Sequence, residues 1–195
     1  MKKILSLLII CFTQICHSQT RYNEDKTVCP NDTLCYLKYD MSLLNGIVYN
    51  EFGDLGLFIN GQRDGLHKIW YDNGQLKLEG NFKNRELDGL LRKWSKNGQL
   101  RWEDNYKDGE KDGLCKWWYE NGQLESEKNY KGDKKDGLSR EWYDDGQLRY
   151  EENYKNGERD GLCKRWYDNG KFWYELNYTN GKEDGLNKPS FSPSL

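Results

Sequence analysis

The sequence repeats itself with a period of 24 residues, and this feature constrains the fold more than any single motif does. Asp-Gly-Leu recurs at this spacing without insertion or deletion, and the six copies begin at Asp64, Asp88, Asp112, Asp136, Asp160 and Asp184. A fixed period indicates small structural units that stack on one another. Such an array offers a long surface and no obvious pocket, which favours binding over catalysis.

Each unit contains a strong β-hairpin signal. In residues 64–87, two runs of β-type residues flank Asn73-Gly74, and both residues of this pair tolerate positive φ. The signal recurs at Asn97-Gly98, Asn121-Gly122, Asp145-Gly146 and Asn169-Gly170. A longer turn is expected from Lys83 to Gly89. The first unit is therefore expected to hold two antiparallel strands, at about residues 66–71 and 75–82.

The sequence thus predicts an all-β fold, an elongated single-layer antiparallel meander of tandem 24-residue β-hairpin repeats. The repeat array is expected to span residues 45–186, with five full units at 64–183, and to extend roughly 48 Å at ~4.8 Å per strand. Residues 19–44 do not repeat and form an N-terminal head. Residues 187–195 form a C-terminal tail, whose prolines stop the ladder. Both ends of the sheet are strand edges, so end-to-end self-association is an open alternative.

The hairpin register has two solutions. A two-residue turn at Asn73-Gly74 pairs Lys68 with Glu79, and opposite charges then face each other in every unit. A three-residue turn with Gly74 as a bulge instead pairs Trp70 with Leu76. The second solution is expected to gather Leu66, Trp70, Leu76 and Phe82, with their equivalents, on one face. We favour it because apolar burial outweighs surface ion pairs, and we expect the two registers to exclude each other.

The first 18 residues have the pattern of a signal peptide: Lys2 and Lys3, a short apolar run, and small residues before a cleavage point near Ser18. We therefore expect an exported protein, in the periplasm, at the cell surface or outside the cell. Cleavage would leave 28 basic against 32 acidic residues. A slightly acidic chain argues against nucleic acid as a partner.

Four cysteines would remain after cleavage. Cys29 and Cys35 lie six residues apart in the head, and export makes a disulfide between them plausible. Cys115 and Cys163 occupy the same position two units apart, about 19 Å at the strand spacing, which is beyond the reach of a disulfide. We interpret them as small side chains at a variable position.

The chain lacks a combination of residues suited to catalysis. His67, the single histidine after residue 18, has no nucleophile within hydrogen-bond reach in the expected stack, and we interpret it as a surface residue at a variable position. The recurring glutamates form a solvated charge ladder, at Glu79, Glu103, Glu127, Glu151 and Glu175. No Cys/His metal motif and no cofactor motif is present. We therefore predict a protein that is not an enzyme and needs no metal or cofactor.

Aromatic residues and variable columns are the candidate binding features. The position of His67 reads His, Leu, Cys, Ser, Cys in successive units, and those of Ile69 and Leu78 vary as widely. Partner specificity could reside in such columns, although drift at exposed sites gives the same pattern. The recurring tryptophan is expected to be mainly a packing spine. Local aromatic excesses give the candidate binding residues, at Trp117, Trp118, Trp166, Phe172, Trp173 and Tyr174. The group in the last full unit, Phe172, Trp173 and Tyr174, fits a contact site and an end cap equally well.

The segment Tyr154-Lys155-Asn156-Gly157-Glu158-Arg159-Asp160-Gly161-Leu162 resembles the MORN repeat, whose units read aromatic-Lys-Asn-Gly-Lys-x-His-Gly-x-Gly. Trp-Tyr-Glu-Asn-Gly-Gln-Leu at 118–124 is similar to a bacterial MORN variant grouped with an antitoxin family. The chain has Asp where the MORN unit has His, and Leu at its second Gly. The resemblance covers about residues 45–186. It implies extended β-hairpin arrays used for protein or membrane attachment, and it implies no catalytic residues.

The sequence as a whole predicts a non-enzymatic, exported binding scaffold whose partner is another macromolecule, with protein the leading choice. The alternatives are an antitoxin or immunity protein that neutralises a toxin, and binding to a glycan or lipid surface of the cell envelope. An export signal fits poorly with neutralisation in the cytoplasm.

Overall fold

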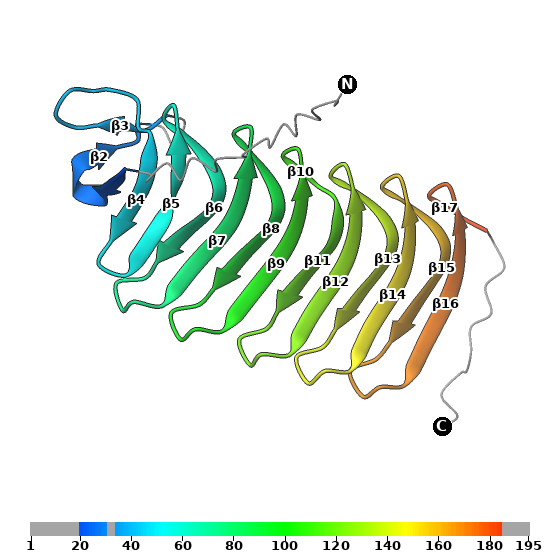
Figure 1. Cartoon of the computed structure of the whole chain (residues 1–195). Coiled ribbons are helices and arrows are strands. Elements are labelled where there is room, and N and C mark those ends of the chain that lie inside the picture. The colour runs from blue at the N-terminus through cyan, green and yellow to red at the C-terminus, as the bar shows by residue number, and fades with distance from the viewer. Residues whose placement is uncertain (1–19, 31–33, 185–195) are drawn as a thin grey trace, which may run out of the picture.

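The computed structural model describes residues 20–30 and 34–184; the expected signal peptide at 1–18 and tail at 187–195 lie outside these residues. The described chain is almost entirely β-strand, and its strands follow one another in a long meander (Figure 1). This confirms the predicted fold class. Fifteen strands form the main sheet, and β2 and β3 form a separate pair.

The elements are β1 (Arg21–Asn23), the 3-10 helix η1 (Glu24–Lys26), β2 (Thr27–Val28), β3 (Tyr36–Leu37), β4 (Gly46–Asn50), β5 (Gly53–Ile59), β6 (Gln62–Trp70), β7 (Leu76–Lys83), β8 (Glu86–Trp94), β9 (Leu100–Lys107), β10 (Glu110–Lys111), β11 (Gly113–Trp118), β12 (Leu124–Lys131), β13 (Lys134–Trp142), β14 (Leu148–Lys155), β15 (Glu158–Trp166), β16 (Phe172–Thr179) and β17 (Lys182–Glu183).

The first turn is the three-residue turn that we favoured, whereas the second differs from the one expected. At Asn73-Gly74 only the glycine has positive φ, at +78°, and Tyr71 N–H donates to the carbonyl of Gln75, so the loop has three residues. The turn predicted to be long is instead tight. Asn84 and Arg85 both have positive φ, 51° and 78°, and β8 begins directly after them. The two-residue turn that matches strand twist therefore lies at this second site.

The two registers that we expected to exclude each other occur in the same hairpin. Lys68 pairs with Glu79, as a two-residue turn would require, and Trp70 pairs with Leu76, as the bulged turn would require. A register shift between Ile69 and Trp70 makes both possible, because Lys77 is an extra residue that offsets the glycine bulge in the turn. The same shift recurs in the other four units, between the residues equivalent to Ile69 and Trp70.

This register separates the side chains into two faces. The repeated face carries the columns of Leu66, Lys68, Trp70, Leu76, Glu79 and Asn81, in which the five units differ only by Lys/Arg exchange and by Phe172 in place of Leu. The variable face carries the columns that contain Arg63, His67, Ile69, Leu78, Gly80 and Phe82. Phe82 was expected beside Trp70. It lies on the other face instead, with its ring centroid 5.4 Å from that of His67.

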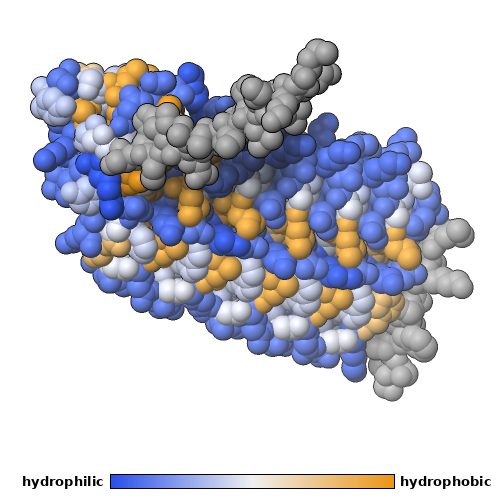
Figure 2. Space-filling model, in the orientation of Figure 1, coloured by the Kyte–Doolittle hydropathy of each residue, from blue (hydrophilic) through white to orange (hydrophobic). Residues whose placement is uncertain are grey.

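The repeated face explains the fixed period. Tyr71 donates its hydroxyl hydrogen to the carbonyl of Trp94 in the next unit, and Tyr119 and Tyr143 make the equivalent bond. Arg92 bridges Glu79 and Glu103, at 3.5 and 2.5 Å, and so joins two units. Arg140 does the same for Glu127 and Glu151. Figure 2 shows apolar residues recurring in rows along the array, separated by hydrophilic ones.

Each strand curves, so the stack of hairpins is not flat (Figure 1). In the second to fifth full units the glycine of Asp-Gly-Leu lies in a β-strand with φ between +103° and +111°, whereas Gly65 of the first unit has φ +68°. Register shifts such as that between Gly80 and Phe82 add to the bend. In the middle of the strands, side chains of the variable face are more buried than those of the repeated face. Side chains converge on the inner side of a curved sheet and cover one another there, so the variable face is the concave side. We call this concave surface the trough.

The head folds onto the first hairpin and covers the N-terminal edge of the array. β1 pairs with β4 in parallel, an exception to the expected antiparallel pattern. A small apolar core joins the head to β4 and β5, with Leu44 fully buried and Leu37, Val48 and Phe58 nearly so. Cys29 and Cys35 form a disulfide beside this core.

Candidate binding surface

The centre of the trough is a column of buried side chains, His67, Leu91, Cys115, Ser139 and Cys163, each at most 9% exposed. His67 was expected at the surface. It lies buried between the rings of Phe58 and Phe82, and Nε2 is 2.7 Å from the carbonyl oxygen of Leu57. Burial lowers the pKa of His67 to about 4, so the ring is neutral near pH 7. Position 67 is therefore both variable between units and buried in each of them.

The two remaining cysteines fill this same column. Both are free and buried, in keeping with their interpretation as small side chains at a variable position. Burial raises the pKa of Cys115 to about 11, and burial also raises the pKa of Cys163. A thiol with a raised pKa is a poor nucleophile at neutral pH. The column therefore serves packing.

Buried acidic groups lie beside this column, and each is paired with a base. Asp104, 4% exposed, is 2.8 Å from Lys111. Glu152, 3% exposed, accepts from Arg159 at 2.9 Å and from Arg165 at 3.1 Å. The hydroxyl of Tyr154 also donates to Glu152, at 2.6 Å; burial and this bond raise the pKa of Tyr154 to about 12. A buried carboxylate needs such partners.

Aromatic rings and cations alternate along the rest of the trough. Lys111 lies over the rings of Trp117 and Tyr130, at 5.1 and 5.4 Å from their centroids. Further along, Lys135 lies 4.5 Å from the ring centroid of Tyr154, and Arg165 lies 4.7 Å from that of Tyr150. Tyr, Trp and Arg are the residues most enriched at protein–protein contacts. The surface has the composition of a protein-binding site.

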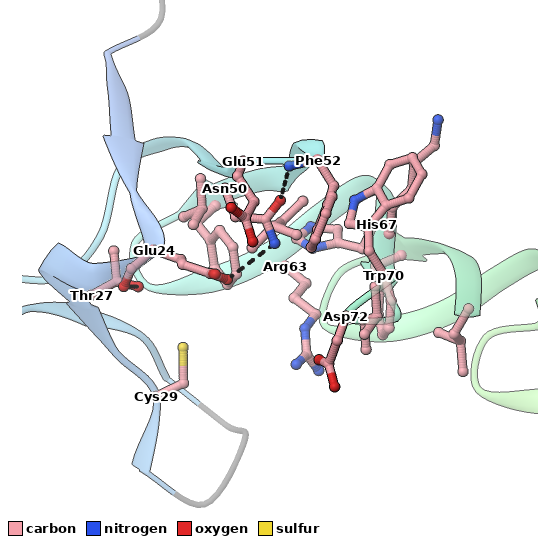
Figure 3. Close-up of a pocket in the computed structure, with 17 residues that line it drawn as sticks. Glu24, Thr27, Cys29, Asn50, Glu51, Phe52, Arg63, His67, Trp70 and Asp72 are labelled. Atoms are coloured by element: carbon pink, nitrogen blue, oxygen red, sulfur yellow. Dashed lines mark hydrogen bonds between the residues drawn. The ribbon is translucent and has the colours of Figure 1, made fainter. Parts of the chain in front are cut away.

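A pocket of about 670 Å³ lies at the N-terminal end of the trough. Figure 3 shows the head residues Glu24 and Thr27 on one side of it and His67 and Trp70 of the first full unit on the other. The variable-face residues of that unit in its wall are largely apolar, among them Ile69, Leu78 and Phe82. The pocket is large enough for a small ligand or a bulky side chain. It was not expected from the sequence, because the head had no predicted structure.

The structure does not bring the six candidate aromatic residues together. Trp117 lies on the variable face, where it pairs with Trp102 of β9, and Trp118 points to the repeated face, where it pairs with Leu124. Trp166 pairs with Phe172 on the repeated face of the last full unit, whereas Tyr174 pairs with Arg165 on the variable face. The candidates are therefore divided between both faces and two distant units.

The aromatic group of the last full unit is nevertheless exposed. Trp173 is 47% and Phe172 38% exposed, and the Trp173 ring stacks on Tyr167 at 5.0 Å between centroids. Lys77 and Arg149 occupy the position of Trp173 in other units, where each lies over the ring of a tyrosine equivalent to Tyr167. In the last unit an aromatic ring thus takes the place of a cation.

The candidate residues predicted from the sequence do not include most aromatic residues of the trough, at Trp102, Tyr106, Tyr130, Tyr150, Tyr154 and Tyr178. A usable signal existed, since position 78 had been recognised as variable and reads Leu, Trp, Ser, Tyr, Tyr. The column of Phe82 was assigned to the wrong face. Its aromatic residues were therefore counted as packing and not as part of a binding surface.

Among residues 20–30 and 34–184, no group of three or more His, Cys, Asp or Glu side chains is arranged to hold a metal ion. In the same residues, no helix has the length and apolar character needed to cross a bilayer.

Comparison with known proteins places these observations in a family. The sequence profile of the MORN repeat variant matches five consecutive segments, residues 63–84, 87–108, 111–131, 135–156 and 159–180, which together exceed half of the chain. No curated protein matches the chain. MORN repeats are in general associated with binding to proteins or membranes, and the family is not known for catalysis. From the five matches and the hairpin that each one forms, we conclude that the chain belongs to the MORN repeat variant family.

Proposed function

We propose that the protein is a non-enzymatic scaffold that binds another protein through the variable face of its trough. We also propose that it acts outside the cytoplasm, after cleavage of a signal peptide near Ser18. The export proposal rests on the basic, apolar and small-residue pattern of residues 1–18.

The separation of the two faces is the observation that supports this proposal. The repeated face holds the unit-to-unit bonds, and its columns hardly change along the chain. The variable face also joins units, through the ion pairs Lys128–Glu141 and Glu152–Arg165, but its residues change from unit to unit. They include tryptophans, tyrosines and arginines instead of the small polar residues of an unused surface. Variation confined to one face suits a surface that contacts different parts of a partner in each unit.

The first experiment identifies the partner and then tests the face. Proximity labelling in the native cell would supply candidates, and pull-down would compare Trp117→Ala with Lys116→Ala, the neighbouring residue on the repeated face. We expect Trp117→Ala to reduce capture at least about tenfold, as for a typical hot-spot aromatic, and Lys116→Ala to leave it unchanged. Circular dichroism would verify that both variants fold. Equal capture by the two variants would contradict the assignment of the face.

The aromatic group at Phe172, Trp173 and Tyr174 requires its own variant. If it is a contact site, Trp173→Ala reduces capture without lowering the melting temperature. If it is an end cap, the same change lowers the melting temperature and leaves capture by the folded protein intact.

The family resemblance also supports a role as an antitoxin or immunity protein, in which the bound protein is a toxin. A toxic neighbouring gene that becomes lethal when this gene is deleted would establish that role, and normal growth of the deletion strain would exclude it. Pelleting with cell walls or liposomes in place of a protein partner would instead indicate glycan or lipid binding.

A further inference from the structure

We infer that the trough takes an extended acidic segment of the partner, with one apolar residue of that segment in the N-terminal pocket and acidic residues at every third position along the units. This inference rests on the proposed protein-binding function and specifies the chemistry of the partner. Three properties of the variable face lead to it: its charge, the spacing of its cations and its change of polarity along the array.

The variable face is basic, although the whole chain has a net charge of −2. From position 63 to position 183 its columns carry seven basic residues, Arg63, Lys93, Lys111, Lys128, Lys135, Arg159 and Arg165, against four acidic ones, Asp104, Glu141, Glu152 and Glu183. The first three of these acids already pair with bases of the same face. The surface therefore has an excess of positive charge that an acidic partner would neutralise.

Lys135 shows where that excess lies. It is half-buried over the ring of Tyr154 and lies on β13, beside the strand that carries Lys128. Among the described residues, no carboxylate forms an ion pair with it. Burial, followed by the charge of Lys128, lowers the pKa of Lys135. The charges of Glu152 and Glu141 act in the opposite direction, but neither carboxylate pairs with Lys135, so an anion supplied by a ligand would stabilise its charge.

The spacing of three cations in one column sets the period of the partner. Two of them, Lys111 and Arg159, also pair with a buried carboxylate, but an ammonium or guanidinium group has further N–H donors for a ligand. Lys111, Lys135 and Arg159 occupy equivalent positions in successive units, two strand spacings apart, or about 10 Å. A peptide in the polyproline II conformation has three residues per turn and advances about 9.3 Å in that length, so every third side chain points the same way. Tyr106, Tyr130 and Tyr154 line the same path, and grooves lined by aromatic residues are the usual sites for this conformation.

The polarity of the trough changes along its length, which gives the partner an apolar end. In the first full unit, positions 67, 69, 78 and 82 carry His, Ile, Leu and Phe, and these residues line the pocket against the head. From the second unit onward the columns of Ile69, Leu78 and Phe82 hold mainly charged and aromatic residues, among them Lys93, Arg165 and the tyrosines. The column of His67 stays uncharged, and Arg63 of the first unit also lines the pocket. An apolar side chain therefore fits the pocket, and the acidic residues follow toward the C-terminal units.

The test uses synthetic peptides and the full mature chain. The probe is a fluorescently labelled peptide with an N-terminal leucine followed by four Pro-Pro-Glu repeats. We expect saturable binding that weakens as the salt concentration rises from about 0.05 to 0.5 M. A peptide of the same composition with its four glutamates adjacent should bind at least about fivefold more weakly, and one with lysine in place of glutamate should not bind. Equal binding of the two glutamate peptides would overturn the three-residue spacing.

Matched variants locate the peptide on the molecule. Lys135→Ala should weaken binding about fivefold, while Lys116→Ala, on the repeated face, should not change it. Ile69→Asp in the pocket should weaken binding about tenfold, whereas Leu66→Asp, as exposed as Ile69 but on the opposite face of β6, should not. Equal effects of the two members of either pair would overturn the placement in the trough.

The outcomes separate this inference from the proposed function. If Trp117→Ala abolishes capture of the native partner but no acidic peptide binds, the trough is still the binding face and the acidic chemistry is wrong. If the acidic peptide binds at the trough while Trp117→Ala still captures the native partner fully, the peptide chemistry stands and the native partner binds elsewhere.

Discussion

At the residue scale, the neutral ring of His67 ties the stability of the first units to pH. Its pKa is lowered from 6.5 to about 4 by burial, so below pH 6.5 the unfolded chain takes up a proton that the folded chain does not. The contribution of the neutral ring to the free energy of unfolding is complete above pH 6.5 and is lost as the pH falls toward 4. We expect a change from pH 7 to pH 5 to cost about 2 kcal/mol at this site.

The chain supplies its own control for this prediction, because leucine occupies the same column in the next unit, at Leu91. In urea unfolding, His67→Leu should remove the part of the pH dependence that lies between pH 7 and pH 5. Identical pH profiles for the two proteins would show that His67 is not held neutral.

The sequence indicated the small residues of this column but not its burial. Cys115 and Cys163 were interpreted correctly as small side chains, because their size and spacing were visible in the repeat. His67 was wrongly placed at the surface because exposure was inferred from variability. In a single-layer sheet with one concave side, a varied column can also be a packed one.

At the element scale, the glycine of Asp-Gly-Leu and the glycines of the turns should respond differently to substitution. Gly113 has φ +108° within the hairpin, and a Cβ there would lie 3.3 Å from Cβ of Asn105. Gly113→Ala should therefore cost about 1–3 kcal/mol. Gly109, at φ +82° in a turn, corresponds to Arg85 of the first unit, which adopts φ 78°. Gly109→Asn should cost less than about 0.5 kcal/mol.

Thermal unfolding of the two variants measures this difference. Equal melting temperatures would contradict the strain assigned to the Asp-Gly-Leu glycine.

The strands could be predicted from turn residues and periodicity, but their register could not. Each of the two candidate pairings was correct over part of the hairpin, because Lys77 forms a second bulge that corrects the first. A bulge of this kind leaves no residue signature, since Lys, Arg, Glu and Trp all occur at its position. The assignment of Phe82 to the wrong face follows from the same ambiguity.

At the scale of the whole molecule, deletions should distinguish the array from its head. Removing residues 111–134 deletes one full period and joins Glu110 to Lys135, which reproduces the native Glu110-Lys111 junction. We expect this variant to be soluble and folded, because every remaining unit keeps its neighbours. Removing the head, residues 19–44, exposes Val48, Phe58 and the edge of β4, and should cause aggregation.

Size-exclusion chromatography and circular dichroism measure both results. A head-deleted protein that remained monomeric would show that the core shared with β4 and β5 is dispensable. An aggregated unit-deleted protein would show that the units are not independent modules.

The hydroxyl of Tyr71 and its equivalents in two later units make the same bond to the following unit. Recombination between two copies within the gene would add or remove a complete unit in frame. The new junction would resemble the existing ones, and the trough would change in length by about 10 Å. The number of repeat units in the gene therefore sets the length of the partner that the protein can contact, and a change in that number requires no change elsewhere in the molecule.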